Sequence, residues 1–386
     1  MTDIFDYLKW RSDVPFSVAP FNDVDNIILS ELSYSDFSGI VSSDDSSVSL
    51  SQVCERFFLM HDRSEIIQNT AINAKAPLLM EYMVSGCRFG NMYLHRFVSK
   101  LDEEKTAQMS AVTYLLDDGS AYVAFRGTDN TLVGWKEDFD IGCLSETRGQ
   151  QLAVDYLKLI AKEINRPLRV GGHSKGGNFA IYAASFISSE VQDRILTVFS
   201  NDGPGFRKEV IEMPGYLRIL PKVVRIIPDT SMIGMLLSNK AEYKVIRSNA
   251  SGILQHDVMS WSTERARFEP AELSDLGKLL NTVLDSWIDD MNDELRNSVT
   301  DTIFAVFEAT GADSFREISH QKLKSAEAML AYLLTIPKEK QGELFHLAGN
   351  LLKNGSQIAL AQLQEQLFTK TENRAEQKES DTSRDA

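Results

Sequence analysis

The sequence predicts an α/β fold in which a mostly parallel sheet is covered by helices on both faces. Three observations support this prediction. The chain of 386 residues has an ordinary globular balance, with 43% hydrophobic and 25% charged residues. Its central part alternates strand-like and helical segments, which is typical of parallel sheets. After about Trp261 the pattern becomes helical, so one large α/β domain is expected to carry a further helical region.

The expected strands are short apolar runs, partly β-branched, that are bounded by turn residues. They lie at 111–116, 121–125, 167–171, 195–199, 223–227 and 243–246. The first two are joined by Asp117-Asp118-Gly119, which is typical of a hairpin turn. Helices are expected where apolar residues recur every three or four positions, at 26–34, around Val53, and at 74–84, 151–164 and 178–188.

This pattern predicts four parts of the chain. Residues 1–70 form a helical N-terminal extension packed on the core, with a loop rich in Ser and Asp at 42–51. Residues 71–262 form the α/β core. Residues 263–370 form a helical domain or a lid, and residues 371–386 form a charged, disordered tail.

Charge and composition argue against several partners and compartments. The formal net charge is −15 and Lys and Arg form no runs, which argues against nucleic acid and anionic membrane surfaces as partners. Cys54, Cys87 and Cys143 are odd in number and widely spaced, so neither a disulfide framework nor a zinc site is expected. The N-terminus does not resemble a signal peptide, and no apolar run approaches the roughly 18 residues of a membrane span. We therefore expect a cytoplasmic protein, whose oligomeric state the sequence does not indicate.

The segment Gly172-His-Ser-Lys-Gly carries the clearest chemical signal. It has the G-x-S-x-G pattern, with an expected strand before it and an Ala-rich helix after it. In such a strand-to-helix turn the glycines avoid clashes, and Ser174 exposes its hydroxyl at the top of the sheet. The backbone N–H of Lys175 then lies at a helix N-terminus, where it can donate to a developing oxyanion. The pattern predicts an α/β-hydrolase with Ser174 as nucleophile, and a structural His173 whose ring points away from the serine hydroxyl.

The other two members of a catalytic triad are expected after the serine, in the order acid and then base. Three histidines follow Ser174, and two of them, His320 and His346, belong to the helical C-terminal region. His256 lies in a loop after the last expected strand. This position predicts that His256 is the base.

Two aspartates are candidates for the acid. Asp202 follows the strand at 195–199, and Asp229 follows the strand at 223–227. Both lie at the carboxyl end of a strand, where the functional groups of open α/β sheets collect. The acid usually follows the penultimate strand, which favours Asp229, whereas some lipases carry it one strand earlier, which favours Asp202.

Two segments resemble class 3 lipases. The chain at 121–129 is similar to the start of their oxyanion-loop region, and the similarity continues through Trp135 and Asp138-Phe-Asp. The G-x-S-x-G segment is similar to their elbow, except that Lys175 replaces the usual leucine. The resemblance implies that the backbone N–H and hydroxyl of Thr128 form the other half of the oxyanion hole.

A wider resemblance links residues 1–262 to the Mbeg-like family of bacterial, lipase-like α/β-hydrolases. The matching segments lie at 5–10, 20–25, 125–128, 173–178, 201–206, 228–236 and 255–261. In this family the aspartate of Asp-Gly-Pro-Gly belongs to the motif, whereas position 229 is not restricted to a carboxylate. The resemblance therefore ranks Asp202 above Asp229, against the strand rule. It implies a hydrolase fold and no particular substrate.

Together these residues predict a serine hydrolase that cleaves a small-molecule or lipid carboxylic ester. His256 takes the proton of Ser174, the N–H groups of Lys175 and Thr128 hold the oxyanion, and water hydrolyses the acyl-enzyme. No metal or organic cofactor is expected. The same triad would serve a thioesterase or an amidase. The alternative of a different class is a non-catalytic hydrolase fold that binds a partner through its C-terminal helices.

Overall fold

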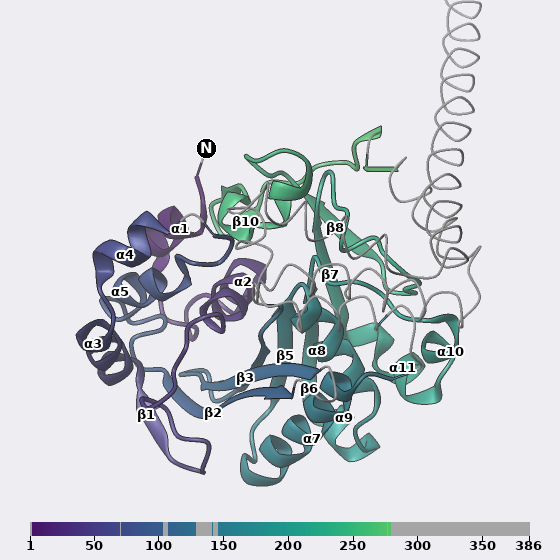
Figure 1. Ribbon diagram of the computed structural model, residues 1–386, viewed down its shortest axis with the longest axis horizontal. Coiled ribbons are helices and arrows are strands. Elements are labelled where there is room, and N and C mark those ends of the chain that lie inside the picture. Colours follow the sequence, from purple (N-terminus) through teal and green to yellow (C-terminus); the bar gives the residue numbers. More distant parts are fainter. Residues whose placement is uncertain are drawn as a thin grey trace, which may run out of the picture.

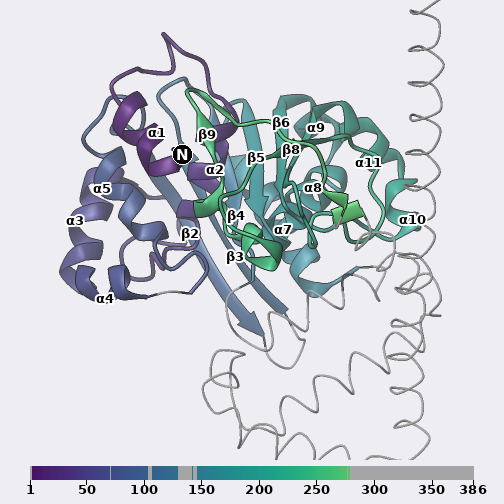
Figure 2. The same cartoon turned by 90° about the horizontal axis from the view of Figure 1, so that it is seen from above.

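One sheet separates two layers of helices (Figures 1 and 2). The computed structural model describes residues 2–69, 71–102, 107–128, 141, 146–275 and 277–278. Helices from the N-terminal part of the chain cover one face of the sheet, and helices from the central part cover the other. Most of the helical region expected from residue 263, and all of the expected tail, lie outside the described residues. Nowhere in the described part is a helix long and apolar enough to cross a membrane.

In the described residues, eight strands form this sheet in their order along the chain. They are β1 (Ser47–Ser49), β2 (Tyr93–Asp102), β3 (Ala107–Leu115), β4 (Ala121–Phe125), β5 (Leu168–His173), β6 (Ile195–Asn201), β7 (Val223–Pro228) and β8 (Tyr243–Ile246). Strands β1 to β4 pair antiparallel, and β4 to β8 pair parallel. The carboxyl ends of the parallel strands therefore meet at one edge, where loops can bring their side chains together. Strands β9 (Thr263–Glu264) and β10 (Arg267–Phe268) form a separate antiparallel pair.

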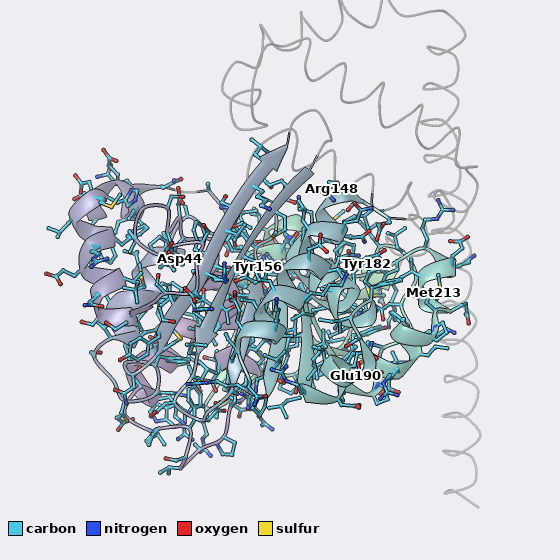
Figure 3. All side chains as sticks on the ribbon, turned by 90° about the horizontal axis from the view of Figure 1, so that it is seen from below. Asp44, Arg148, Tyr156, Tyr182, Glu190 and Met213 are labelled. Carbon is cyan, nitrogen blue, oxygen red and sulfur yellow. The ribbon has the colours of Figure 1, made fainter. Side chains whose placement is uncertain are left out.

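The helices occur in two groups along the chain. The first group is α1 (Ile4–Arg11), α2 (Asp23–Leu32), α3 (Leu50–Met60), α4 (Arg63–Gln68), the 3-10 helix η1 (Ala76–Leu78) and α5 (Leu79–Met83). The second is α7 (Arg148–Glu163), α8 (Lys175–Ser185), α9 (Ser189–Arg194), α10 (Lys208–Ile211), α11 (Pro214–Ile219) and η2 (Leu220–Lys222). Figure 3 shows Tyr156 and Tyr182 on helices of this second group. Two further 3-10 helices, η3 (Gly252–His256) and η4 (Val258–Ser260), follow β8.

Local sequence explains how the covering helices begin and why the central strands are apolar. Asn22 caps α2 and Thr147 caps α7, each in a reciprocal capping box with the residue three positions later. Strand β4 lies between the two layers, and all five of its side chains are buried. Uniform burial is expected for a strand that is covered on both faces, and it explains the continuous apolar run seen in the sequence.

Buried polar side chains tie α2 to the sheet. The Asn26 side chain donates to Asn201 Oδ1 at 2.8 Å and accepts from the Tyr122 hydroxyl at 2.6 Å. The Ser30 hydroxyl lies 2.7 Å from the Tyr122 hydroxyl and accepts from Asn201 Nδ2 at 3.0 Å. These four side chains are buried, so each hydrogen bond offsets the cost of removing a polar group from water. Helix α2 is thereby fixed against β4 and against the end of β6.

The expected α/β fold with a mostly parallel sheet is confirmed, and the strands expected at 121–125 and 243–246 have the bounds of β4 and β8. The expectation of a loop at 42–51 is wrong for β1, which is held as a strand by its pairing with β2. Strand β2 was not expected. A bulge between His95 and Val98, with Arg96 at a φ of 51°, breaks the alternation that would have revealed it.

Candidate active site

Ser174 occupies a sharp turn between β5 and α8. Its φ of 57° and ψ of −132° lie in a region that side chains other than glycine rarely adopt. A Cβ on Gly172 would lie 2.4 Å from the backbone carbon of Gly176, and a Cβ on Gly176 would lie 2.0 Å from the Phe125 carbonyl oxygen. Only glycine fits at these two positions, which explains the G-x-S-x-G pattern. With this elbow, the sheet has the architecture of the α/β-hydrolase fold expected from the sequence.

Backbone hydrogen bonds fix the elbow at the end of the sheet. The Ser174 N–H donates to the Asn201 carbonyl at 2.9 Å, and the Ser174 carbonyl accepts from the Gly177 N–H at 2.9 Å. The first bond joins the ends of β5 and β6. Helix α8 begins at Lys175, so the backbone N–H of this residue lies in the first turn of a helix. The Ser174 side chain is only half-buried.

Asp202 follows β6 directly and is almost fully buried. Its Oδ2 accepts from His256 Nδ1 at 2.7 Å. Its Oδ1 accepts from the Ser231 hydroxyl and from the Gly234 N–H, the latter at 3.1 Å. Three donors therefore converge on one carboxylate, which compensates for its burial.

Asp229 lies nearby but does not contact the imidazole through a hydrogen bond. Its Oδ1 accepts from Gln255 Nε2 at 2.7 Å and from the Thr230 hydroxyl at 3.1 Å. Asp229 thus holds the residue that precedes His256. Of the two candidate acids, Asp202 is therefore the one that hydrogen-bonds His256 Nδ1.

The loop that carries His256 is held from several sides. The Gln255 carbonyl accepts from Trp261 Nε1 at 2.8 Å, and Gln255 Oε1 accepts from the Thr230 N–H at 2.8 Å. In the neutral tautomer that donates Nδ1–H to Asp202, the lone pair of the imidazole lies on Nε2. Among the described residues no hydrogen bond yet joins His256 to the Ser174 hydroxyl. His320 and His346 lie outside the described residues.

His173 has two hydrogen-bond partners of its own. Its Nε2 lies 2.8 Å from the His256 carbonyl oxygen, and its Nδ1 lies 2.9 Å from the Tyr34 hydroxyl. The centroids of the two imidazole rings are 4.4 Å apart. Burial, and then the nearby His256, hold the pKa of His173 well below its ordinary value, so this ring is neutral. Sequence reasoning did not find Tyr34, because no motif connects a residue after α2 with the elbow.

The loop after β4 passes close to the nucleophile. A Cβ on Gly127 would lie 3.0 Å from Ser174 Cβ and 2.6 Å from the His173 carbonyl oxygen. Thr128 directly follows Gly127 and is half-buried, and Lys175 directly follows Ser174. The two residues expected to form the oxyanion hole are therefore each next in sequence to a residue of this close approach. The Lys175 side chain is itself buried, with Nζ 5.8 Å from the centre of the Phe179 ring. Residues 129–140, which include Trp135 and Asp138-Phe-Asp of the class 3 lipase resemblance, lie outside the described residues.

Comparison with known proteins identifies a family. Residues 83–305 match the sequence model of the family described as Mbeg1-like, and this segment contains all three triad candidates and Asp229. The match confirms the family indicated by the sequence motifs, although the motifs at 5–10 and 20–25 lie outside the matched segment. No curated protein matches the chain in sequence.

Several solved lipase structures are similar to the chain. The Rhizomucor miehei lipase in its propeptide complex is 13% identical, over 69% of this chain and 94% of that chain, with a TM-score of 0.31. A lipase from Rhizopus microsporus var. chinensis is 11% identical, over 60% of this chain and 83% of that chain, with a TM-score of 0.34. The Lip2 lipase from Yarrowia lipolytica is 15% identical, over 48% of this chain and 73% of that chain, with a TM-score of 0.29.

Proposed function

The chain belongs to the Mbeg1-like family, and from this premise and the geometry of its site we propose that it is a serine hydrolase that cleaves carboxylic esters. The observation that carries the proposal is the hydrogen bond of 2.7 Å between His256 Nδ1 and Asp202 Oδ2, beside a serine on a strained elbow. A buried carboxylate fixes the tautomer of the imidazole and stabilises its protonated form. These are the requirements for a base that activates a hydroxyl.

In the proposed mechanism His256 Nε2 removes the proton of Ser174 as the hydroxyl oxygen attacks the ester carbonyl. The half-buried serine side chain turns toward the imidazole when substrate binds, because catalytic hydrogen bonds often tighten only in the complex. The N–H groups of Lys175 and Thr128 stabilise the oxyanion. The protonated imidazole then gives its proton to the leaving alcohol, and the acyl-enzyme is hydrolysed by a water that His256 activates in turn.

We propose that the substrate is a small-molecule or lipid ester. The chain supplies nucleophile, base, acid and oxyanion donors, so this mechanism requires no cofactor. A cytoplasmic location is part of the same proposal and is supported by Cys54 and Cys87, both of which are free thiols.

The test is labelling of the purified protein by a fluorophosphonate probe, followed by hydrolysis of short-chain p-nitrophenyl esters. Wild type should be labelled at Ser174, and Ser174→Ala should be neither labelled nor active. His256→Ala should lose a similar amount of activity, on the order of 10⁴-fold or more, because triad members act as a unit. A folded wild-type protein that resists the probe would contradict the proposal. Labelling combined with turnover of thioesters or amides, but not of esters, would retain the nucleophile and change the substrate class.

A further inference from the structure

We propose that Tyr34 and His173 are positioning residues that fix the distance between nucleophile and base, so that the N-terminal segment completes the active site. This inference rests on the proposed function and names residues that act on the base through hydrogen bonds. Tyr34 follows α2, which lies against the sheet on the face opposite α7 and α8 (Figure 2).

The direction of the hydrogen bonds follows from the chemistry of the partners. The His256 carbonyl can only accept, so His173 Nε2 must carry the hydrogen and donate it over 2.8 Å. A neutral imidazole with its hydrogen on Nε2 has a lone pair on Nδ1. The Tyr34 hydroxyl therefore donates to His173 Nδ1 over 2.9 Å. The two hydrogen bonds therefore run in one direction: Tyr34 donates to His173, and His173 donates to the backbone carbonyl of His256.

The position of His173 in the sequence explains why these two hydrogen bonds would matter for catalysis. His173 directly precedes Ser174, and it hydrogen-bonds the backbone of His256. One imidazole thus links the two residues between which a proton must move. Asp202 sets the orientation of the His256 ring, whereas His173 sets the position of the backbone from which that ring extends. Misplacement of a catalytic group by about 1 Å can cost on the order of 100-fold in rate.

Tyr34 also contacts the loop that leads to Thr128. A Cβ on Gly127 would lie 2.2 Å from the Tyr34 hydroxyl oxygen, so the hydroxyl lies directly against the backbone of this loop. One side chain therefore supports both the base and the loop expected to bind the oxyanion. Tyr34 follows the end of α2, which Asn26 and Ser30 fix against the sheet.

The experiment compares Tyr34→Phe with Tyr182→Phe. Tyr182 is a matched control because its hydroxyl also makes a side-chain hydrogen bond, to Glu146 at 2.7 Å, in the other helix layer (Figure 3). Tyr34→Phe should lower the kcat for p-nitrophenyl ester hydrolysis and the rate of fluorophosphonate labelling about tenfold, with little change in KM. Tyr182→Phe should react like wild type. Thermal unfolding of each variant checks that the fold is retained.

A second measurement does not depend on activity. In ¹⁵N NMR spectra of wild type, His173 should remain neutral with its hydrogen on Nε2 down to a pH well below 6.5, and its Nδ1 signal should shift in Tyr34→Phe and not in Tyr182→Phe. His173→Gln, which keeps a donor near the Nε2 position, should retain more activity than His173→Leu.

The outcomes separate the two proposals. A wild-type protein that reacts with the probe, beside a Tyr34→Phe variant that reacts equally fast, would overturn the positioning role and leave the serine hydrolase intact. A wild-type protein that does not react would overturn both. If His173 of the wild type titrated near pH 6.5, the proposed hydrogen bonds from Tyr34 to His173 and from His173 to His256 would be contradicted, whatever the activity.

Discussion

Replacing Asp202 by asparagine tests the assignment of the acid, because the surrounding donors dictate how the new side chain must lie. The Ser231 hydroxyl and the Gly234 N–H both donate to Oδ1, so the amide oxygen of the asparagine takes that position. The NH₂ group must then face His256 Nδ1. Two donors cannot share a hydrogen bond, and the imidazole is driven to the tautomer with its hydrogen on Nε2.

An imidazole with its hydrogen on Nε2 cannot accept the proton of Ser174. We therefore expect Asp202→Asn to lower kcat for a p-nitrophenyl ester on the order of 10⁴-fold, the cost of the wrong tautomer in a triad. The matched control is Asp229→Asn, because an amide oxygen there can still accept from Gln255 Nε2. This control should change stability by about 1 kcal/mol or less and leave kcat near that of wild type.

Two measurements decide the outcome of this comparison. Steady-state kinetics give kcat for both variants, and ¹⁵N NMR reports which nitrogen of His256 carries the hydrogen. If Asp202→Asn retains kcat within tenfold of wild type, or if Asp229→Asn is the more damaged variant, the reasoning is refuted. An unchanged tautomer of His256 in Asp202→Asn would refute it independently of the kinetics.

Two further predictions concern stability. Ser174→Gly should be about 1 kcal/mol more stable than Ser174→Ala in urea unfolding, because both lack the hydroxyl and only glycine relieves the strained backbone; equal stability would contradict the strain. Glu31 is fully buried, and its pKa is raised well above the ordinary 4.5, mainly by burial and secondly by the nearby Asp257. The stability that protonated Glu31 contributes to the folded state is therefore complete below pH 4.5 and is lost as the pH rises through the raised pKa. Glu31→Gln should therefore melt at an increasingly higher temperature than wild type as the pH rises above 4.5, whereas a pH-independent difference would contradict this.

The elbow was predictable because its signal is local. Two glycines and a serine between a strand and a helix determine the turn, and the structure shows the backbone contacts that exclude any other residue at Gly172 and Gly176. His256 could be singled out by its place after β8, the last strand of the large sheet, because few histidines follow the serine.

The choice between Asp202 and Asp229 could not be made from strand positions. Both follow neighbouring parallel strands, which bring them to the same edge of the sheet. The packing of the loop at 231–234 against Oδ1 decides which carboxylate meets His256. Tyr34 was not visible at all, because its partner lies 139 residues away and a single tyrosine after a helix carries no pattern.

The hydrogen bond from His173 to His256 spans 83 residues, and the bond from Tyr34 to His173 spans 139. Contacts of such long range close large loops and form late in folding. During synthesis the ribosome releases the tyrosine first, the serine next and the base last. Under the proposed mechanism, a partly made chain holds Ser174 without its proton acceptor, and we expect hydrolytic activity to emerge only when residues beyond β8 have folded back onto the helices that precede β1.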